Sequence, residues 1–308
     1  MTLALLITNP AAARTDARAV RAVLDTLRDG GWRVDVLATH GPGDARRFAV
    51  EARSQGCDVV VSYGGDGTAM QVAAGLLGSG IPLGLVSGGT GNLLAGNLRL
   101  PRAPVAAARA MLRGTTRFVD LGAVERRDGM HYFAVAGGAG YDAEIMAGTS
   151  AVTKRRWKMA AYLARGLSTL RHVTSVCHRV TVDGRVHEAP AAVVLVANCG
   201  ELFPPVVKLR NVRPDDGWLD VVVLRAEGVV QSFHAAWDLL LGVQNGSGRV
   251  WLARGRDVRV EVLDGPPRRV QLDGEVVGET PFEARLLPGA LAVLTLPVAA
   301  SQHPRRAS

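Results

Sequence analysis

Short apolar runs alternate with amphipathic segments over the first third of the chain. The apolar runs predict strands over 3–8, 33–38, 58–63 and 81–86. The segments around them place Ala, Val and Leu at helical spacing and predict helices over 14–29, 44–55, the stretch to about 77, and 105–113. Strands that alternate with helices are typical of parallel strands joined by crossover helices. We therefore predict an α/β domain over 1–122, built on a parallel sheet.

After about Gly122 the pattern changes to short apolar runs separated by turn residues. We predict strands over 132–136, 178–182, 191–197, 219–224, 258–263 and 269–272, with helical patterns at 158–170 and 229–241. Asp183-Gly184 is a typical hairpin turn. The pattern predicts a β-rich, β-sandwich-like second domain over 123–289. A last strand in 290–298 could return to the first domain, and 299–308 is expected to be a flexible tail.

Composition narrows the class of protein. The 308 residues include 36 Lys and Arg against 28 Asp and Glu, which gives a net charge of +8 and favours phosphate-bearing ligands or an anionic membrane. The three cysteines are widely spaced without a Cys-x-x-Cys pair, which favours a reducing cytosol over a disulfide framework or a zinc site. No apolar run reaches the ~18–20 residues of a membrane span. We expect a cytoplasmic protein whose membrane contact is peripheral.

Two glycine-rich turns follow predicted strands. Gly64-Gly65-Asp66-Gly67-Thr68 follows the strand 58–63, and Ser87-Gly88-Gly89-Thr90-Gly91-Asn92 follows 81–86. Glycines let the backbone approach an anion, and the free N–H groups at a helix start point at it. Asp66 could hold Mg²⁺ on phosphates, and Thr68 could be a helix N-cap or a phosphate donor. An ordinary strand-to-helix turn is the alternative for either motif alone. No Gly-Lys-Ser/Thr follows, so the turn is not a P-loop.

These turns belong to an ordered series of motifs. The series comprises Ile7-Thr8-Asn9-Pro10, Thr39 with Gly43-Asp44-Ala45, the two glycine turns, Val119-Asp120-Leu121-Gly122, Asp216-Gly217 and Leu272-Asp273-Gly274-Glu275. In this order the chain resembles the diacylglycerol kinase catalytic-domain superfamily, which includes bacterial lipid kinases and sphingosine kinases. The resemblance extends from Leu3 to Leu296 and implies an ATP- and Mg²⁺-dependent kinase that phosphorylates a lipid hydroxyl at a membrane surface.

The resemblance also implies a role for each matching position. The nucleotide would be surrounded by Asn9, Pro10, Thr39, Gly64, Gly65, Asp66, Gly67, Thr68, Gln71, Gly89, Thr90 and Asn92. Asp66 and Asp120 would organise the catalytic magnesium, and Glu275 would be the general base. Asp216, with the main-chain carbonyls of Arg213 and Trp218, would hold a structural magnesium.

The chain departs from the family pattern at two places. Leu93 follows Asn92 where many members have Asp, and Met70-Gln71 stands where many have Asn-Glu. The carboxylates of Asp66, Asp120 and Glu275 remain, so we expect activity with a thinner metal network.

Other functions stay open as alternatives. An NAD kinase shares a Gly-Gly-Asp-Gly turn and a β-rich second domain, but the runs expected for holding NAD are absent. Gly138-Ala139-Gly140-Tyr141-Asp142-Ala143 fits the G-x-G-x-x-A of dinucleotide-dependent oxidoreductases, without the acidic residue expected about 20 positions on. Close packing of a loop is the other interpretation of these glycines. A non-catalytic lipid- or nucleotide-binding protein is the third alternative.

The basic cluster Lys154-Arg155-Arg156-Trp157-Lys158 is the best candidate for contact with a membrane surface, with an ordinary solvated face as the alternative. Nucleic acid is not an expected partner, because aromatic residues make up 5% of the chain and are not interleaved with the arginines. A homodimer and the identity of the lipid stay open.

Overall fold

The computed structural model describes residues 1–140, 175–203, 207–209, 211–225 and 249–297. The chain divides into two compact units. The N-terminal unit consists of Met1–Thr90, Leu98–Arg117 and the segment from Ala292, and the C-terminal unit consists of Gly91–Asn97 and Phe118–Leu291. Several predictions lie outside the described residues: those on 158–170 and 229–241, the cluster Lys154–Lys158, Ala143 and the tail 299–308.

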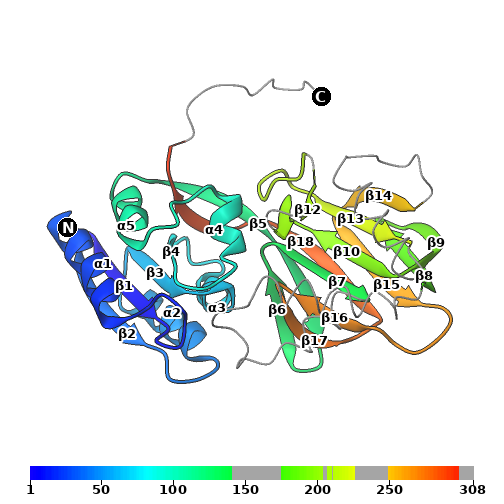
Figure 1. Ribbon diagram of the computed structural model, residues 1–308, viewed down its shortest axis with the longest axis horizontal. Helices are drawn as coiled ribbons and strands as arrows, with labels where there is room; N and C mark the ends of the chain where they lie inside the picture. Colours follow the sequence, from blue (N-terminus) through cyan, green and yellow to red (C-terminus); the bar gives the residue numbers. More distant parts are fainter. Residues whose placement is uncertain (141–174, 204–206, 210, 226–248, 298–308) are drawn as a thin grey trace. The chain divides into compact units, whose positions relative to one another are not determined.

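The N-terminal unit alternates strands and helices, as the apolar pattern predicts. Its elements are β1 (Leu3–Thr8), α1 (Ala17–Asp29), β2 (Arg33–Ala38), α2 (Asp44–Ser54), β3 (Val59–Gly64), α3 (Asp66–Leu76), β4 (Leu83–Ser87) and α5 (Pro104–Leu112) (Figure 1). The sheet order is β2-β1-β3-β4, with every neighbouring pair parallel. The end of β18 (Phe282–Thr295) adds a parallel partner to β4 through Val293 and Leu83. The predicted α/β class is confirmed.

Helices cover both faces of this parallel sheet. Val23 and Leu27 of α1 and Met111 of α5 pack with residues of the sheet in one core cluster. α2 packs against α3, and a Cβ at Gly75 of α3 would lie 2.7 Å from the Ala49 side chain and from a carbonyl of α2. The two helices can approach this closely because position 75 carries no side chain.

The start of α1 differs from the prediction. The helix was expected from residue 14, but it begins at Ala17, because Asp16 has extended backbone angles and its side chain accepts a hydrogen bond from the Ala19 N–H. The Arg14 N–H donates to the Gly88 carbonyl instead, and the Thr15 hydroxyl donates to the Asn9 carbonyl at the start of the same loop. Three residues of the predicted helix are therefore part of the loop after β1.

The described part of the C-terminal unit consists mostly of antiparallel strands. Among the residues that the structure describes, they are β5 (Thr115–Arg126), β6 (Gly129–Phe133), β7 (Ala136–Gly140), β8 (Val176–Val182), β9 (Arg185–Ala191), β10 (Val193–Ala197), β11 (Glu201–Phe203), β12 (Val207–Lys208), β13 (Leu219–Leu224), β14 (Val250–Gly255), β15 (Asp257–Val262), β16 (Arg269–Leu272), β17 (Glu275–Glu279) and the first part of β18, together with one short helix, α4 (Leu93–Asn97). One sheet has the order β14-β13-β10-β7-β16-β17. The second sheet is formed by β18, β15, β8 and β9, and through β18 it is continuous with the parallel strands β2-β1-β3-β4.

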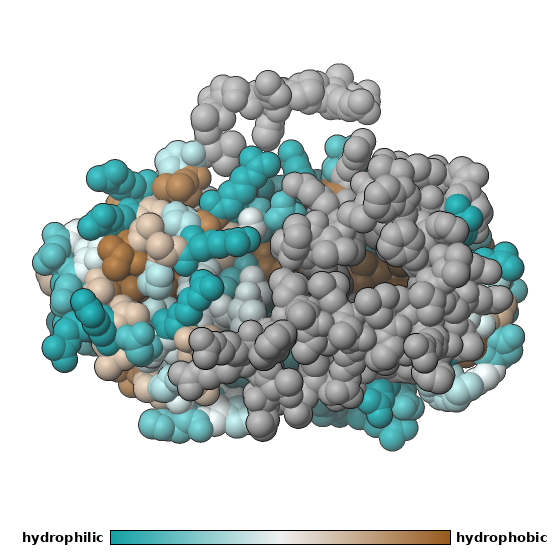
Figure 2. Space-filling model, in the orientation of Figure 1, coloured by the Kyte–Doolittle hydropathy of each residue, from teal (hydrophilic) through white to brown (hydrophobic). Residues whose placement is uncertain are grey.

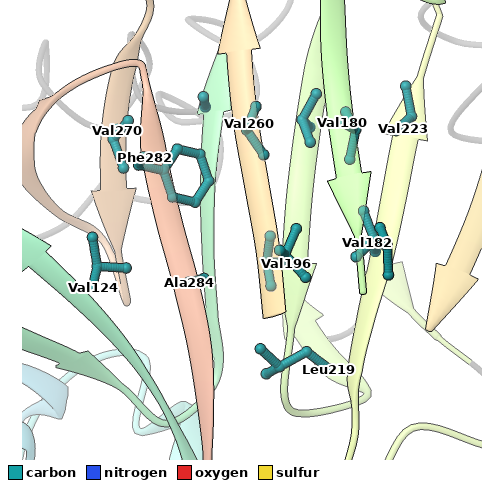
Figure 3. Packing of buried hydrophobic residues seen from close by; sticks show 14 of the residues in the cluster. Val124, Val180, Val182, Val196, Leu219, Val223, Val260, Val270, Phe282 and Ala284 are labelled. Carbon is teal, nitrogen blue, oxygen red and sulfur yellow. The ribbon is translucent and has the colours of Figure 1, made fainter. Parts of the chain in front are cut away.

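Valine side chains from both sheets fill the space between them. Val180 and Val260 come from the second sheet, and Val196 and Val223 come from the first; all four belong to one buried cluster (Figure 3). Two sheets that enclose one apolar layer form a sandwich. This confirms the β-rich, sandwich-like second domain. The predicted hairpin turn at Asp183-Gly184 is also confirmed, since it joins β8 to β9 with positive φ at both residues.

The strand predicted over 132–136 is wrong as a single element. β6 ends at Phe133 and β7 begins at Ala136, with a bend between them. The bend arises because the Asp273 carboxylate accepts the N–H groups of residues 134, 135 and 136. The sequence predicted no strand at β5, because charged and apolar residues alternate there and form no continuous apolar run; it showed only the motif around Asp120.

The glycines of the oxidoreductase-like motif lie inside β7, not at the start of a helix. A Cβ at Gly138 would lie 2.6 Å from the Val194 carbonyl, and one at Gly140 would lie 2.2 Å from the Ala192 carbonyl. These glycines allow β7 and β10 to pair closely. This explains them without a dinucleotide.

Figure 2 shows hydrophilic and apolar residues mixed on the visible surface of the N-terminal elements. Among the described residues, no helix combines the length and the apolar composition that a membrane span requires.

His178 is a buried titratable group in the C-terminal unit. It lies on β8, is 1% exposed, and its Nδ1 contacts the Val176 carbonyl at 2.8 Å, while Nε2 has no partner within the described chain. Burial lowers the pKa of His178 below its ordinary value, helped by Arg268 and opposed by Val176 and Asp264. The folded state therefore binds this proton less readily than the unfolded state.

We predict that stability falls as the pH drops below about 6.5, where the unfolded histidine takes up its proton, with a slope from this one group of at most about 1.4 kcal/mol per pH unit. Urea unfolding at several pH values would measure it. His178→Gln should flatten this part of the profile, whereas His40→Gln, at an exposed histidine, should not. Equal profiles for wild type and His178→Gln would contradict the assignment.

Candidate active site

Three loops follow the carboxyl ends of neighbouring parallel strands in the N-terminal unit. They are the loop 9–15 after β1, the turn that begins at Gly64 after β3, and the turn after β4. The N–H groups of Gly88 and Gly89 both donate to the Gly64 carbonyl, at 2.8 and 3.1 Å, and the Arg14 N–H donates to the Gly88 carbonyl at 3.0 Å. Backbone hydrogen bonds thus hold all three loops together.

The close approach of these loops depends on glycine. A Cβ at Gly88 would lie 3.1 Å from the Gly64 Cα and 2.8 Å from Thr15 Cγ2, and a Cβ at Gly64 would lie 2.6 Å from Thr68 Oγ1. Gly65 differs, because its Cβ would meet only the Gly89 Cα, at an ordinary 3.6 Å. Gly64 and Gly88 are needed for packing, whereas the absence of a side chain at Gly65 leaves space beside the start of α3.

α3 begins without a side-chain cap. Its N-cap is Gly65, in extended conformation, and Asp66 and Gly67 lie in its first turn. The prediction that Thr68 is the N-cap is therefore wrong. Thr68 is buried, and its Oγ1 accepts a hydrogen bond from Asn9 Nδ2 at 3.1 Å, which fastens the first loop to the helix. A helix start whose N–H groups have no side-chain cap attracts anions.

Thr39 and Gln71 connect the loop after β2 to the same region. The Thr39 N–H donates to the Thr8 carbonyl at 2.9 Å, and the Gln71 side-chain oxygen accepts the Gly43 N–H at 3.2 Å. Gln71, one of the two departures from the family pattern, thus positions the start of α2.

Asp44 orders the loop between β2 and α2. Its carboxylate accepts the N–H groups of His40 and Gly41 at 2.8 and 3.0 Å. These bonds, first that of His40, together with Arg47 lower the pKa of Asp44 to about 2. The loop therefore keeps a fixed negative charge at neutral pH.

An open groove of about 520 Å³ lies beside the end of β1. It is lined by Thr8, Pro10, Thr15 and the α1 residues from Ala17 to Arg28 that face it. Of the residues predicted to bind a nucleotide, Pro10 alone lines it.

The residues of the second glycine turn divide between the two units. Gly89 and Thr90 belong to the N-terminal unit, and Asn92 belongs to the C-terminal unit. Asn92 has φ of 50°, and its carbonyl accepts the Gly96 N–H at 2.9 Å, so it begins α4.

Asp120 is a buried carboxylate in the C-terminal unit. It lies on β5 and is 4% exposed; Oδ2 accepts the Gly217 N–H at 2.8 Å, and Oδ1 accepts the Gly289 N–H at 2.7 Å. Its own N–H donates to the Pro214 carbonyl. Asp120 therefore joins β5 to the loop before β13 and to β18.

Asn198 extends this set of contacts, although its sequence context gave no signal of a role. Its Nδ2 donates to the carbonyls of Asp120 and Ala134, both at 2.8 Å. The side chain is fully buried, and its Oδ1 has no partner among the described residues. Such a buried amide fixes the neighbouring backbone by joining two carbonyls, although the Ala134 carbonyl also accepts the Cys199 thiol at 3.2 Å.

Asp273 fixes the hairpin that carries Glu275. Asp273 and Gly274 have positive φ values of 47° and 91° and form the turn between β16 and β17. Asp273 is not a solvated acid, since it accepts three backbone N–H groups from residues 134–136 at 2.7 to 3.0 Å. Glu275 is the exposed first residue of β17. A buried network thus links Asp120, through Asn198 and Ala134, to this hairpin.

Arg213, Asp216 and Trp218 lie in one loop of the C-terminal unit. Asp216 Oδ1 accepts the Trp218 N–H at 3.2 Å, and Oδ2 lies 3.6 Å from Arg254. Burial raises the pKa of Asp216 above its ordinary value, and Arg254 opposes the shift. Arg213 pairs with Asp215 at 3.5 Å.

Two family models match the chain. Residues 3–124 match the model described as "Diacylglycerol kinase catalytic domain", and residues 135–295 match "YegS C-terminal NAD kinase beta sandwich-like domain".

Relatives of known name match nearly the whole chain. A Pseudomonas aeruginosa protein named "Probable lipid kinase YegS-like" is 34% identical over 277 residues, which are 89% of this chain and 88% of that protein. The "Diacylglycerol kinase" of Mycobacterium tuberculosis is 27% identical over 296 residues, 94% of this chain and 93% of that protein. The chain also spans 56% of the length of a longer uncharacterized Synechocystis protein, with 26% identity. The crystal structure of a diacylglycerol kinase from Bacillus anthracis has the same fold, with a TM-score of 0.72 and 22% identity over 96% of this chain and 97% of that one.

The buried network of the C-terminal unit predicts that Asn198→Ala lowers the free energy of unfolding by about 1–3 kcal/mol, because the buried carbonyls of Asp120 and Ala134 each lose a hydrogen bond from the amide. Urea unfolding would measure the loss. Gln55→Ala, which removes an exposed amide, should change stability by less than about 0.5 kcal/mol. Equal effects of the two substitutions would show that the network adds nothing to stability.

Proposed function

This chain belongs to the diacylglycerol kinase catalytic-domain family, and we propose that it transfers the γ-phosphoryl group of ATP to the hydroxyl group of a lipid. The observation that carries the proposal is the uncapped start of α3 beside the glycine turns of Gly64 and Gly88. Phosphoryl transfer needs positioning and charge neutralisation more than covalent chemistry from the protein. A rigid cradle of backbone N–H groups is suited to that task.

The N-terminal unit fits a nucleotide polyphosphate. Gly65 leaves room for an anion beside the start of α3, where the helix dipole adds attraction. The loops that would enclose the nucleotide are held to one another by hydrogen bonds, so little ordering remains to be done on binding. We assign nucleotide contact to Asn9, Pro10, Thr39, Gly65, Gly67, Thr68, Gln71, Gly89, Thr90 and Asn92.

Asp66 fits a magnesium ion carried by ATP. Its carboxylate belongs to the first turn of α3, so phosphates bound there would bring more negative charge to the same place. Carboxylates and phosphates are the ligands with which proteins hold Mg²⁺. Bound there, the ion would neutralise the phosphoryl oxygens as the bond to the departing ADP breaks.

The C-terminal unit supplies the groups for the acceptor. We assign Glu275 to accept the proton of the lipid hydroxyl while that oxygen attacks the γ-phosphorus, so that a lipid phosphate and ADP are formed. Asp273 and Asn198 position the hairpin of Glu275. Each oxygen of Asp120 accepts one N–H and keeps a lone pair, which suits Asp120 to order water around the ion.

The lipid nature of the acceptor is supported by the names of relatives, one called a probable lipid kinase and another a diacylglycerol kinase. A hydroxyl beside an apolar body would be presented at a membrane surface, so we propose peripheral action at the cytoplasmic face. The description of the family model that matches the sandwich-like domain names NAD kinase, so NAD is included as a competing acceptor of the phosphoryl group in the test.

The experiment is to incubate the purified protein with Mg²⁺, ATP labelled in the γ-phosphoryl group, NAD and a panel of lipids in mixed micelles. The panel contains diacylglycerol, monoacylglycerol, phosphatidylglycerol and sphingosine. We expect label in one of the lipids. Glu275→Gln should slow this transfer by about 10²–10⁴-fold, as expected for a lost general base. Glu279→Gln, at an exposed carboxylate of the same strand, should leave the rate within twofold, on the order of a neutral surface change.

Label in NAD and in no lipid would make the protein an NAD kinase. Label in neither acceptor would make it a binding protein, and both results contradict the proposal.

A matched glycine pair tests the cradle. Gly65→Ala should leave stability nearly unchanged, because its Cβ makes ordinary contact, yet raise the Kd for Mg·ATP about tenfold or more by filling the space beside α3. Gly88→Ala should lower the melting temperature, because its Cβ meets backbone of Gly64 at 3.1 Å. Calorimetric titration measures the Kd for Mg·ATP, and thermal unfolding measures the melting temperature of each variant. Unchanged ATP affinity in Gly65→Ala would place the phosphates elsewhere.

A further inference from the structure

The loop before β13 is where the family resemblance implies a structural magnesium, held by the Asp216 carboxylate and two main-chain carbonyls. In this chain the loop already holds a cation of its own. Arg254 of β14 pairs across the sheet with Asp220 of β13. Its Nε and Nη2 reach the two Asp220 oxygens at 3.1 and 3.0 Å, a bidentate contact.

The same guanidinium reaches further into the loop. Arg254 Nη2 also donates to the Asn211 carbonyl at 3.2 Å and lies 3.6 Å from Asp216 Oδ2. One arginine therefore contacts both carboxylates and the backbone of the loop. The Asp216 and Asp220 side chains are 14% and 19% exposed, so their charges need a nearby cation.

A second arginine, Arg256, contacts the same loop at Gly217 and Trp218. Arg256 Nε donates to the Gly217 carbonyl at 3.3 Å, and its guanidinium carbon lies 5.0 Å from the centre of the Trp218 ring. The Gly217 N–H is bonded to Asp120. The loop is thus held at its carboxylates, its carbonyl and its aromatic ring by groups of the chain itself.

These contacts do not fit a magnesium ion. Mg²⁺ needs near-octahedral oxygen ligands at about 2.1 Å and dehydrates reluctantly. Asp216 Oδ1 accepts the Trp218 N–H and keeps a lone pair, but Oδ2 faces the Arg254 guanidinium at 3.6 Å, and this positive charge would repel a dication bound by the same carboxylate.

We propose that Arg254 takes the place of the structural magnesium in this chain. Its guanidinium neutralises Asp216 and Asp220 and holds the loop before β13, and the C-terminal unit is stable without a divalent cation. Because Asp120 is bonded to Gly217 of this loop, Arg254 also supports the position of Asp120. The proposal rests on the family membership and on these contacts, and it does not depend on which acceptor is phosphorylated.

The test is thermal unfolding of the full chain without nucleotide, in excess EDTA and in excess MgCl₂. An Asp66→Asn background removes any contribution from magnesium in the N-terminal unit. We expect the same melting temperature in both solutions. A rise with MgCl₂ in the Asp66→Asn protein that Asp216→Asn abolishes would show a metal in the loop and overturn the proposal.

The arginine itself is tested in EDTA with Arg254→Gln, which should lower the melting temperature by about 3–8 °C because two largely buried carboxylates lose their cation. The matched control is Arg285→Gln, at an arginine that pairs with Asp257 and is 75% exposed; it should shift by about 1 °C or less. Equal shifts in the two variants would overturn the proposal. A chain with the expected melting behaviour that phosphorylates no lipid would refute the proposed function and leave this inference standing.

Discussion

The structure depends most on a constraint in the N-terminal unit: two backbone N–H groups, of Gly88 and Gly89, reach the single carbonyl of Gly64. The bonds form because no side chain stands between the two turns, and a Cβ at Gly88 would lie 3.1 Å from the Gly64 Cα. The parallel sheet brings the ends of β3 and β4 to the same edge, and glycine lets the turns meet there. The start of α3, with Asp66 in its first turn, is held by this arrangement, and so is the loop of Asn9. Any account of nucleotide binding by this chain begins from these contacts.

The C-terminal unit holds several carboxylates in fixed positions within an antiparallel sandwich. Asp120 and Asp273 both use backbone N–H groups as partners, and Asn198 joins the Asp120 carbonyl to that of Ala134, whose N–H is bonded to Asp273. Hydrogen bonds to backbone cost no side-chain entropy at the donor and keep a carboxylate charged. Asp216 and Asp220 are held by Arg254 instead. The unit thus keeps its acids ordered with its own donors.

The sequence predicted those parts of the fold that depend on local pattern. The strands and helices of the N-terminal unit follow from apolar periodicity, and the Asp183-Gly184 and Asp273-Gly274 turns follow from the preference of these residues for positive φ. The break between Phe133 and Ala136 could not be predicted, because it is made by a carboxylate 139 residues further along the chain. For Thr68 the sequence left two roles open, a helix N-cap or a phosphate donor, and it could not reveal the bond to Asn9, 59 residues away, because that bond is set by the tertiary fold. Asn198 and Arg254 gave no signal, since their roles arise only when strands pair.

The proposed reaction makes one prediction that no binding protein or ATPase shares: the phosphoryl group passes directly from ATP to the acceptor. With ATP carrying ¹⁸O on the terminal oxygens of the γ-phosphoryl group, mass spectrometry of the product would follow each oxygen. The account predicts a lipid phosphate that contains all of the labelled terminal oxygens and is joined to the lipid through the unlabelled hydroxyl oxygen. Label found only in inorganic phosphate, with the lipid unmodified, would contradict it.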